Sequence, residues 1–136
     1  MPDPSLRPIV INENERPRDG WDDPVRGRIH WRTLFSKGLS ASEAITCGVA
    51  SLEPGDWLAR HRHAPPEIYY VLDGTGIVTL EEKEVAIEAG HAVFIPAMAR
   101  HGIRQTGERT LKFFYAFAVD GFEDVTYLFP GDEASV

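Results

Sequence analysis

The sequence has little cysteine, fewer basic than acidic residues and no long apolar run. Cys47 is the single cysteine among 136 residues, which excludes an internal disulfide and a thiolate-rich zinc site. Lys and Arg number 14 against 21 Asp and Glu, and a net charge of −7 repels phosphate backbones, so we expect no nucleic-acid partner. No stretch is apolar over the length that a bilayer requires, and the first residues, MPDPSLRPIV, lack the pattern of a signal peptide. We therefore expect a soluble cytoplasmic protein without a membrane partner.

Turn residues and short apolar runs dominate what is present. Twelve Gly and ten Pro are spread along a chain that is 43% hydrophobic, with seven Phe, four Tyr and three Trp, enough for one domain with one core. Glu53-Pro54-Gly55-Asp56 and Asp73-Gly74-Thr75-Gly76 are typical turns between such runs. The pattern predicts strands over residues 29–35, 44–52, 57–61, 67–72, 75–80, 84–88, 92–95, 101–105, 110–118 and 125–128. Strands of this length and spacing indicate an all-β fold, an antiparallel sandwich or barrel.

The chain before Ile29 differs in composition from the rest. Residues 1–28 are polar and rich in Pro, Asp and Arg, and Ile9-Val10-Ile11 is their one apolar patch. We expect them to form an irregular arm that packs on the barrel, with room for an edge strand, and residues 29–136 to form the barrel as a single domain. Trp21 is interpreted as an arm-packing residue.

Three histidines and a glutamate have the spacing of a metal site. Residues i and i+2 of a strand share a face, so His61 and His63 point the same way. A return of the chain at Pro65-Pro66 brings Glu67 against both imidazoles, and His101 at the start of a later strand completes the set. This donor set suits one divalent ion, Fe, Mn, Ni, Co or Zn, and leaves coordination positions open for water or substrate.

The spacing of these residues resembles that of the cupin superfamily. The pattern G-x5-H-x-H-x3-E-x6-G runs without a gap over Gly55–Gly74, and the second motif, G-x5-P-x4-H, follows over Gly90–His101. The resemblance covers roughly residues 45–118 and implies a double-stranded β-helix, or jelly-roll barrel. Met98 stands where the second motif usually has Gly, and Gln105 where it usually has Asn.

The resemblance extends to one group of enzymes. Residues 29–31, 67–69, 110–117, 120–122 and 125–130 are similar to the small cupin-type dimethylsulfoniopropionate lyases. The likeness implies a lyase that forms dimethyl sulfide and acrylate, with Tyr69 as the base and Tyr127 as a second pocket tyrosine. A sulfonium cation also suits aromatic faces, for which Trp31, Tyr115 and Phe117 are further candidates.

Other interpretations of the same residues stay open. Tyr69 is also a common wall residue in cupins. Three His and one Glu equally support a non-haem metal dioxygenase of a small organic acid, and a barrel that binds a small acid without transforming it is the alternative outside catalysis. Arg104 lies an odd number of residues from His101 and is expected to point outward. The partner is expected to be a small carboxylate, and the oligomer a homodimer.

Overall fold

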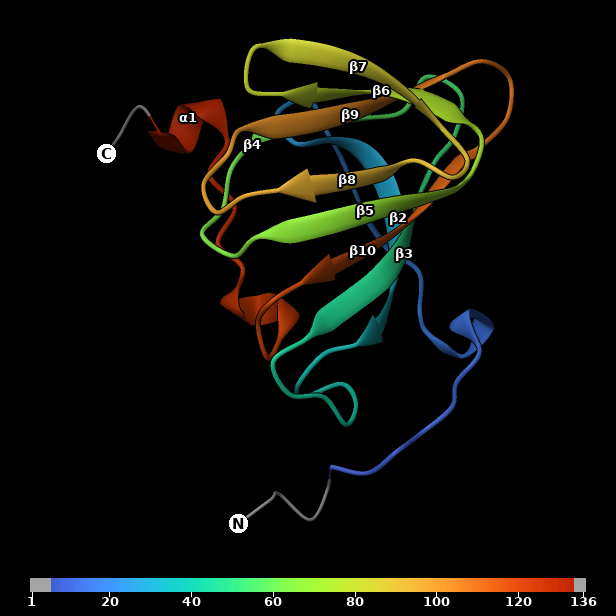
Figure 1. Ribbon diagram of the computed structural model, residues 1–136, viewed down its shortest axis with the longest axis vertical. Coiled ribbons are helices and arrows are strands. Elements are labelled where there is room, and N and C mark those ends of the chain that lie inside the picture. Colours follow the sequence, from blue (N-terminus) through green and yellow to red (C-terminus); the bar gives the residue numbers. More distant parts are fainter. Residues whose placement is uncertain (1–5, 134–136) are drawn as a thin grey trace.

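The computed structural model describes residues 6–133, which contain ten strands and three short helical turns (Figure 1). The elements are η1 (Glu13–Glu15), β1 (Asp19–Asp23), β2 (Gly27–Phe35), β3 (Thr46–Leu52), β4 (Trp57–His61), β5 (Glu67–Asp73), β6 (Thr75–Leu80), β7 (Lys83–Glu88), β8 (Ala92–Ile95), β9 (His101–Thr106), β10 (Leu111–Phe117), η2 (Phe122–Asp124) and α1 (Pro130–Glu133). None of the described helices has the length and apolar character that a bilayer crossing requires.

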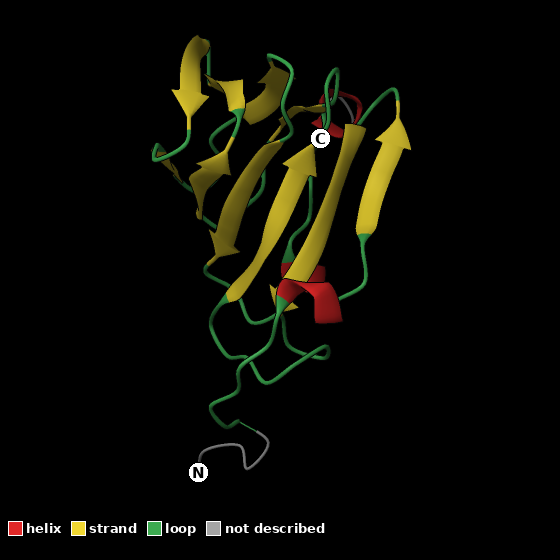
Figure 2. Cartoon of the chain, turned by 90° about the vertical axis from the view of Figure 1, so that its right-hand side faces the viewer, coloured by secondary structure: helices red, strands yellow, loops and turns green. Residues whose placement is uncertain are grey.

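The strands form one curled antiparallel sheet. Their order is β7-β6-β9-β4-β2-β3-β10-β5-β8, and β1 pairs with β2 beside this path. Curling brings the two halves of the sheet face to face, with the core between them (Figure 2). The expectation of an all-β jelly-roll barrel is therefore confirmed.

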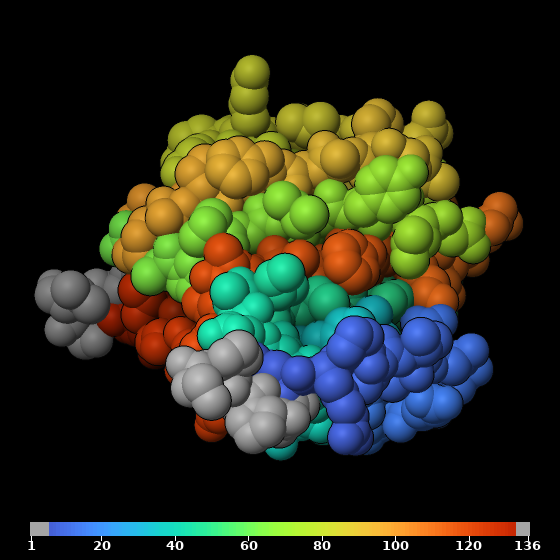
Figure 3. All heavy atoms as spheres, turned by 60° about the horizontal axis from the view of Figure 1, so that its bottom comes forward, coloured from blue at the N-terminus to red at the C-terminus, as the bar shows by residue number. Residues whose placement is uncertain are grey.

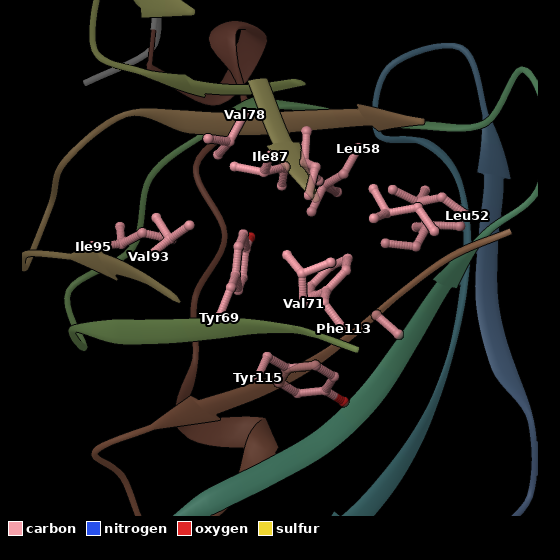
Figure 4. Packing of buried hydrophobic residues seen from close by; sticks show 14 of the residues in the cluster. Leu52, Leu58, Tyr69, Val71, Val78, Ile87, Val93, Ile95, Phe113 and Tyr115 are labelled. Carbon is pink, nitrogen blue, oxygen red and sulfur yellow. The ribbon is translucent and has the colours of Figure 1, made fainter. Parts of the chain in front are cut away.

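Side-chain alternation explains which face of each strand is inside. In β5, Glu67, Tyr69 and Val71 are buried while Ile68 and Tyr70 are exposed. Strand β10 likewise buries every second residue, Leu111, Phe113, Tyr115 and Phe117. Figure 4 shows Tyr69 and Tyr115 extending from neighbouring strands toward the interior. Burying a carboxylate on the inner face of an otherwise apolar strand destabilises the fold unless the carboxylate has a partner. The burial of Glu67 therefore indicates that its carboxylate has a binding partner.

The N-terminal segment packs on the outer face of the sheet. Arg16 Nε donates to the carbonyl of Leu34 at 3.1 Å, and Lys112 Nζ lies 2.6 Å from Glu13 Oε1. Figure 3 shows this segment in blue beside the teal residues of β3. The patch Ile9-Val10-Ile11 forms no strand; the edge strand is β1, which lies further along the expected arm and pairs with β2. The first five residues of the arm and the last three of the expected barrel lie outside the described residues.

The prediction of a strand over residues 125–128 is wrong. After Gly121 the chain turns through η2, and only Leu128 then pairs, forming an isolated bridge with Arg62. Val125 and Phe129 are buried and Tyr127 is partly buried, so the alternation that suggested a strand is real. The segment is held by its side chains and one backbone pair because it crosses the end of the barrel without following a neighbouring strand.

Candidate metal centre

Three strands deliver the polar residues to one end of the barrel. His61 is the last residue of β4 and pairs directly with His101, the first residue of β9. Glu67 begins β5, and His63 lies in the short connection between β4 and β5. All four side chains are at most 5% exposed. The structure thus brings together all four residues that the sequence nominated as metal ligands.

Each imidazole is oriented by a backbone carbonyl. His61 Nδ1 lies 2.7 Å from the oxygen of Ala59, His101 Nδ1 2.9 Å from that of Ala99, and His63 Nδ1 2.8 Å from that of Pro65. A carbonyl oxygen only accepts, so Nδ1 carries the hydrogen in all three rings. This fixes the tautomer and leaves Nε2 of each neutral imidazole with a free lone pair, the arrangement found in metal-binding histidines.

The three imidazoles lie together, and two of them place Nε2 against the carboxylate of Glu67. One ligand atom from each of His61, His63 and His101 lies within 4.8 Å of the others. Glu67 Oε1 is 3.2 Å from His63 Nε2 and 3.3 Å from His101 Nε2. The buried Nε2 of His101 has no hydrogen-bond partner among the described residues. Facing acceptor atoms repel unless a cation or an added proton lies between them, so the donor set fits a divalent ion.

Electrostatics keep one imidazole neutral. Burial lowers the pKa of His61 well below its usual value, and the neighbouring His101 and His63 act in the same direction. A neutral imidazole is the form that binds a metal. The burial that disfavours protonation of His61 therefore favours its use as a ligand.

An aromatic cavity opens beside these ligands. Glu67 is its one charged lining residue. The aromatic rings of the lining come from Trp21, Trp31, Tyr69, Phe113, Tyr115, Phe117, Phe122 and Tyr127. The Tyr127 ring packs 5.3 Å from that of His61 and 5.5 Å from that of His63, measured between ring centroids. The cavity thus joins an apolar aromatic wall to the polar cluster.

The cavity tyrosines are held in the neutral phenol form. Burial, followed by the charge of Glu67, raises the pKa of Tyr69 and Tyr127 well above the usual value. Burial also raises the pKa of Tyr115. A cation that neutralised Glu67 would remove one cause of these shifts.

Sequence comparison identifies the family to which this site belongs. The pattern of the family described as "Cupin domain" matches residues 48–117. The chain belongs to the cupin family. It is 40% identical over 122 residues to the dimethylsulfoniopropionate lyase DddW of Ruegeria pomeroyi, with 90% of this chain and 80% of that protein covered. It is 33% identical over 89 residues to the oxalate-binding protein of Thermotoga maritima, covering 65% and 74%.

A solved structure shows a similar cupin barrel. The crystal structure of a predicted oxalate decarboxylase from Thermotoga maritima superposes with a TM-score of 0.73 at 27% identity, covering 82% of this chain and 99% of that one.

All five aromatic residues nominated from the sequence of this cupin line the cavity: Trp31, Tyr69, Tyr115, Phe117 and Tyr127. Sequence reasoning missed three more aromatic lining residues, Trp21, Phe122 and the β10 residue Phe113. Trp21, interpreted as an arm-packing residue, packs edge-on to Trp31 with centroids 5.0 Å apart, and Phe122 in η2 stacks on Trp31 at 5.9 Å. The sequence did contain a signal for Trp21: it is the one apolar residue within Asp19–Asp23, which indicates that its side chain is the one that packs inward. Arg104 points outward as expected and pairs with Glu84 at 2.7 Å.

Proposed function

We propose that this cupin is a metal-dependent lyase that cleaves dimethylsulfoniopropionate to dimethyl sulfide and acrylate. The observation that carries the proposal is the aromatic cavity, whose one charged lining residue, Glu67, also lies against the imidazoles of His63 and His101. A zwitterionic substrate with a carboxylate at one end and a sulfonium at the other matches a site that is polar at one side and aromatic at the other. The similarity to DddW of Ruegeria pomeroyi supports the same reaction.

His61, His63, Glu67 and His101 would hold the divalent ion, which is Fe, Mn, Ni, Co or Zn by the chemistry of the donors. When bound, such an ion supplies positive charge that withdraws electrons from a substrate carboxylate and acidifies the adjacent C–H. The carbonyls of Ala59, Pro65 and Ala99 keep the three imidazoles oriented toward it.

Tyr69 takes the proton in this proposal. Its side chain is 2% exposed and lines the cavity beside Glu67. Tyr69 would act as the phenolate, the form that a cation offsetting the charge of Glu67 would favour. Its oxygen removes a proton from the α-carbon of the substrate, and the electrons of that C–H bond form the new C=C bond. The C–S bond breaks with its electron pair going to sulfur, which leaves as neutral dimethyl sulfide. The products are acrylate, dimethyl sulfide and the phenol of Tyr69, so charge and atoms balance.

The aromatic rings would bind the departing end of the substrate. Trp31, Tyr115, Phe117 and Tyr127 line the cavity and present no basic group to it. A sulfonium is attracted to ring faces, whereas neutral dimethyl sulfide lacks the charge that holds it there. The same wall therefore favours substrate binding over product retention.

The decisive experiment combines elemental analysis with a headspace assay for dimethyl sulfide. Purified protein is stripped of metal and reloaded separately with Fe, Mn, Ni, Co and Zn, then assayed with and without oxygen. Dimethyl sulfide and acrylate in equal amounts, formed anaerobically, support the lyase. Oxygen consumption without sulfide release indicates the dioxygenase instead, and tight binding of a small acid with no product indicates a ligand-binding cupin. Either result would reject the proposal.

A further inference from the structure

A surface groove lies next to the aromatic cavity. An open groove is lined by Asp19, Gly20, Trp31, Thr33, Ser36, Leu39, Phe122 and Glu123. Trp31 and Phe122 also line the cavity. Their rings stack with centroids 5.9 Å apart and planes 21° from parallel. This one pair of rings therefore forms part of the wall between the groove and the cavity.

The groove is acidic as well as aromatic. Asp19 and Glu123 are its charged lining residues, and both are exposed. Asp19 lies directly across from Trp31 in the β1–β2 pairing, so the two side chains share a face. Lys37 belongs to the same loop region as Ser36 and Leu39, yet it does not line the groove.

A buried polar atom lies between the groove and the cavity. The side chain of Tyr115 is 5% exposed, and its hydroxyl interacts with the side chain of the groove residue Thr33, which opposes the rise in pKa that burial causes. Tyr115 lies over Gly48, where an added Cβ would collide with its hydroxyl oxygen. Gly48 pairs in turn with the groove residue Thr33. Burial is the main cause that raises the pKa of this phenol, and the charge of Asp19 is the smallest contribution in the same direction.

We propose that this groove is a recruitment site for small onium cations and the entrance to the aromatic cavity. The carboxylates of Asp19 and Glu123 attract the cation, and the ring faces of Trp31 and Phe122 bind it. Neutral and anionic molecules of the same size gain neither interaction. The groove would thus select positively charged substrates for the proposed lyase. Only the identity of the natural cation rests on that proposed function.

Phe122 is the movable half of the ring pair. Trp31 lies within β2, whose residues pair with β1 on one side and β3 on the other. Phe122 begins the three-residue turn η2, and its N–H donates to Ser36 Oγ at 2.8 Å. A single turn held by side-chain hydrogen bonds rearranges more easily than a paired strand. Passage from groove to cavity therefore involves displacement of the Phe122 ring.

The test uses metal-free full-length protein and trimethylsulfonium as the probe, with tert-butanol as a neutral molecule of similar shape. Binding is followed by tryptophan fluorescence and calorimetry. We expect wild-type protein to bind trimethylsulfonium and not tert-butanol. The double variant Asp19→Asn, Glu123→Gln should bind it about tenfold more weakly. Glu108→Gln, an exposed acid that does not line this groove, serves as the matched control and should bind as wild type.

Two outcomes would overturn the inference: unchanged trimethylsulfonium affinity in the double variant, or equal wild-type affinity for tert-butanol. Circular dichroism of each variant checks that the barrel is folded. The probe lacks a carboxylate and the protein lacks metal, so the result is independent of turnover. Onium binding without dimethyl sulfide release would reject the proposed function alone. Release with a kcat/KM unchanged by Asp19→Asn and Glu123→Gln would reject the recruitment site alone.

Discussion

Glu67 Oε1 lies 3.2 Å from His63 Nε2, and both atoms are acceptors when the histidine donates through Nδ1. Two buried acceptors at this distance destabilise the fold unless a positive charge lies between them. The same oxygen is 3.3 Å from His101 Nε2. The stability of the barrel should therefore depend on a bound cation.

The first prediction concerns metal removal. Metal-free protein should unfold at a lower temperature, and a divalent ion at about 100-fold its Kd should restore about 2.7 kcal/mol of stability. Glu67→Ala should abolish most of this response because it removes the charged ligand. Differential scanning calorimetry with elemental analysis measures both effects. Glu84→Gln, at an exposed acid, should respond to metal as wild type does. Equal unfolding temperatures with and without metal would show that no ion binds here.

The second prediction tests the proposed base. Tyr69→Phe keeps the buried ring and removes only the hydroxyl, so metal content should stay unchanged while kcat falls about 10²- to 10⁴-fold. Tyr70→Phe is a matched control, because Tyr70 is the next residue of the same strand and is 46% exposed on the outer face. Steady-state kinetics by headspace analysis compares the two variants. Full turnover by Tyr69→Phe would make Tyr69 a wall residue.

A third prediction follows from the raised pKa of the cavity tyrosines. A phenol whose pKa is higher in the folded than in the unfolded protein stays protonated longer when folded. Its stabilising contribution is complete below the unfolded value of about 10 and is lost as pH rises beyond it. Metal-free protein should lose up to about 1.4 kcal/mol per pH unit for each such tyrosine. Urea unfolding across this range measures the slope.

Tyr115→Phe provides the check, because burial raises the pKa of Tyr115 and the side chain of Thr33 opposes this rise only in part. The variant should show a shallower loss of stability at alkaline pH and little change near neutrality. A slope identical to that of wild type would mean that Tyr115 ionises equally easily in both states.

Local pattern predicted most of the strands because each is bounded by turn residues and alternates inward and outward. The spacing of His61, His63, Glu67 and His101 likewise nominated residues that the structure brings together. Trp21 and Phe122 were not predicted to line the cavity, because their positions depend on contacts between segments that are distant in the sequence. The strand of Trp21 exists through its pairing with β2, and Phe122 reaches the cavity through a turn tied to Ser36. The homodimer stays a prediction.

Met98 provides a prediction about backbone strain. Its φ is +64°, a left-handed conformation that costs a residue with a Cβ about 1 kcal/mol. Its N–H donates to the carbonyl of His63 at 2.8 Å, so the turn before His101 must keep this shape. Met98→Gly should therefore raise the free energy of unfolding by about 0.5–1 kcal/mol, as measured with urea. Met98→Ala retains the Cβ and should bring no gain; stabilisation by both variants would point to the side chain instead.

Gln105 connects two loops at the other end of the strands that carry His61 and His101. Its Oε1 accepts from the N–H of Gly55 at 3.3 Å, and its Nε2 donates to the carbonyls of Gly107 at 3.0 Å and Arg109 at 2.8 Å. Gln105→Ala removes all three bonds from a side chain that is 8% exposed, and should cost about 1–3 kcal/mol of stability. The side chain in Gln105→Asn is one methylene shorter and cannot reach both loops. The free energy of unfolding of this variant should therefore lie between those of wild type and Gln105→Ala. Arg104→Gln, at an exposed neighbour, should stay within about 0.5 kcal/mol of wild type.

Metal affinity separates a local from a global effect of Gln105→Ala. His61 and His101 pair directly at the opposite end of β4 and β9, and their Nδ1 atoms are held by Ala59 and Ala99 within the same region. Loosening the distant loops leaves these contacts in place. Isothermal titration should therefore give an unchanged Kd for the divalent ion in a variant with a lower unfolding free energy. A Kd that weakened in step with stability would show that the ligand geometry depends on the whole length of both strands.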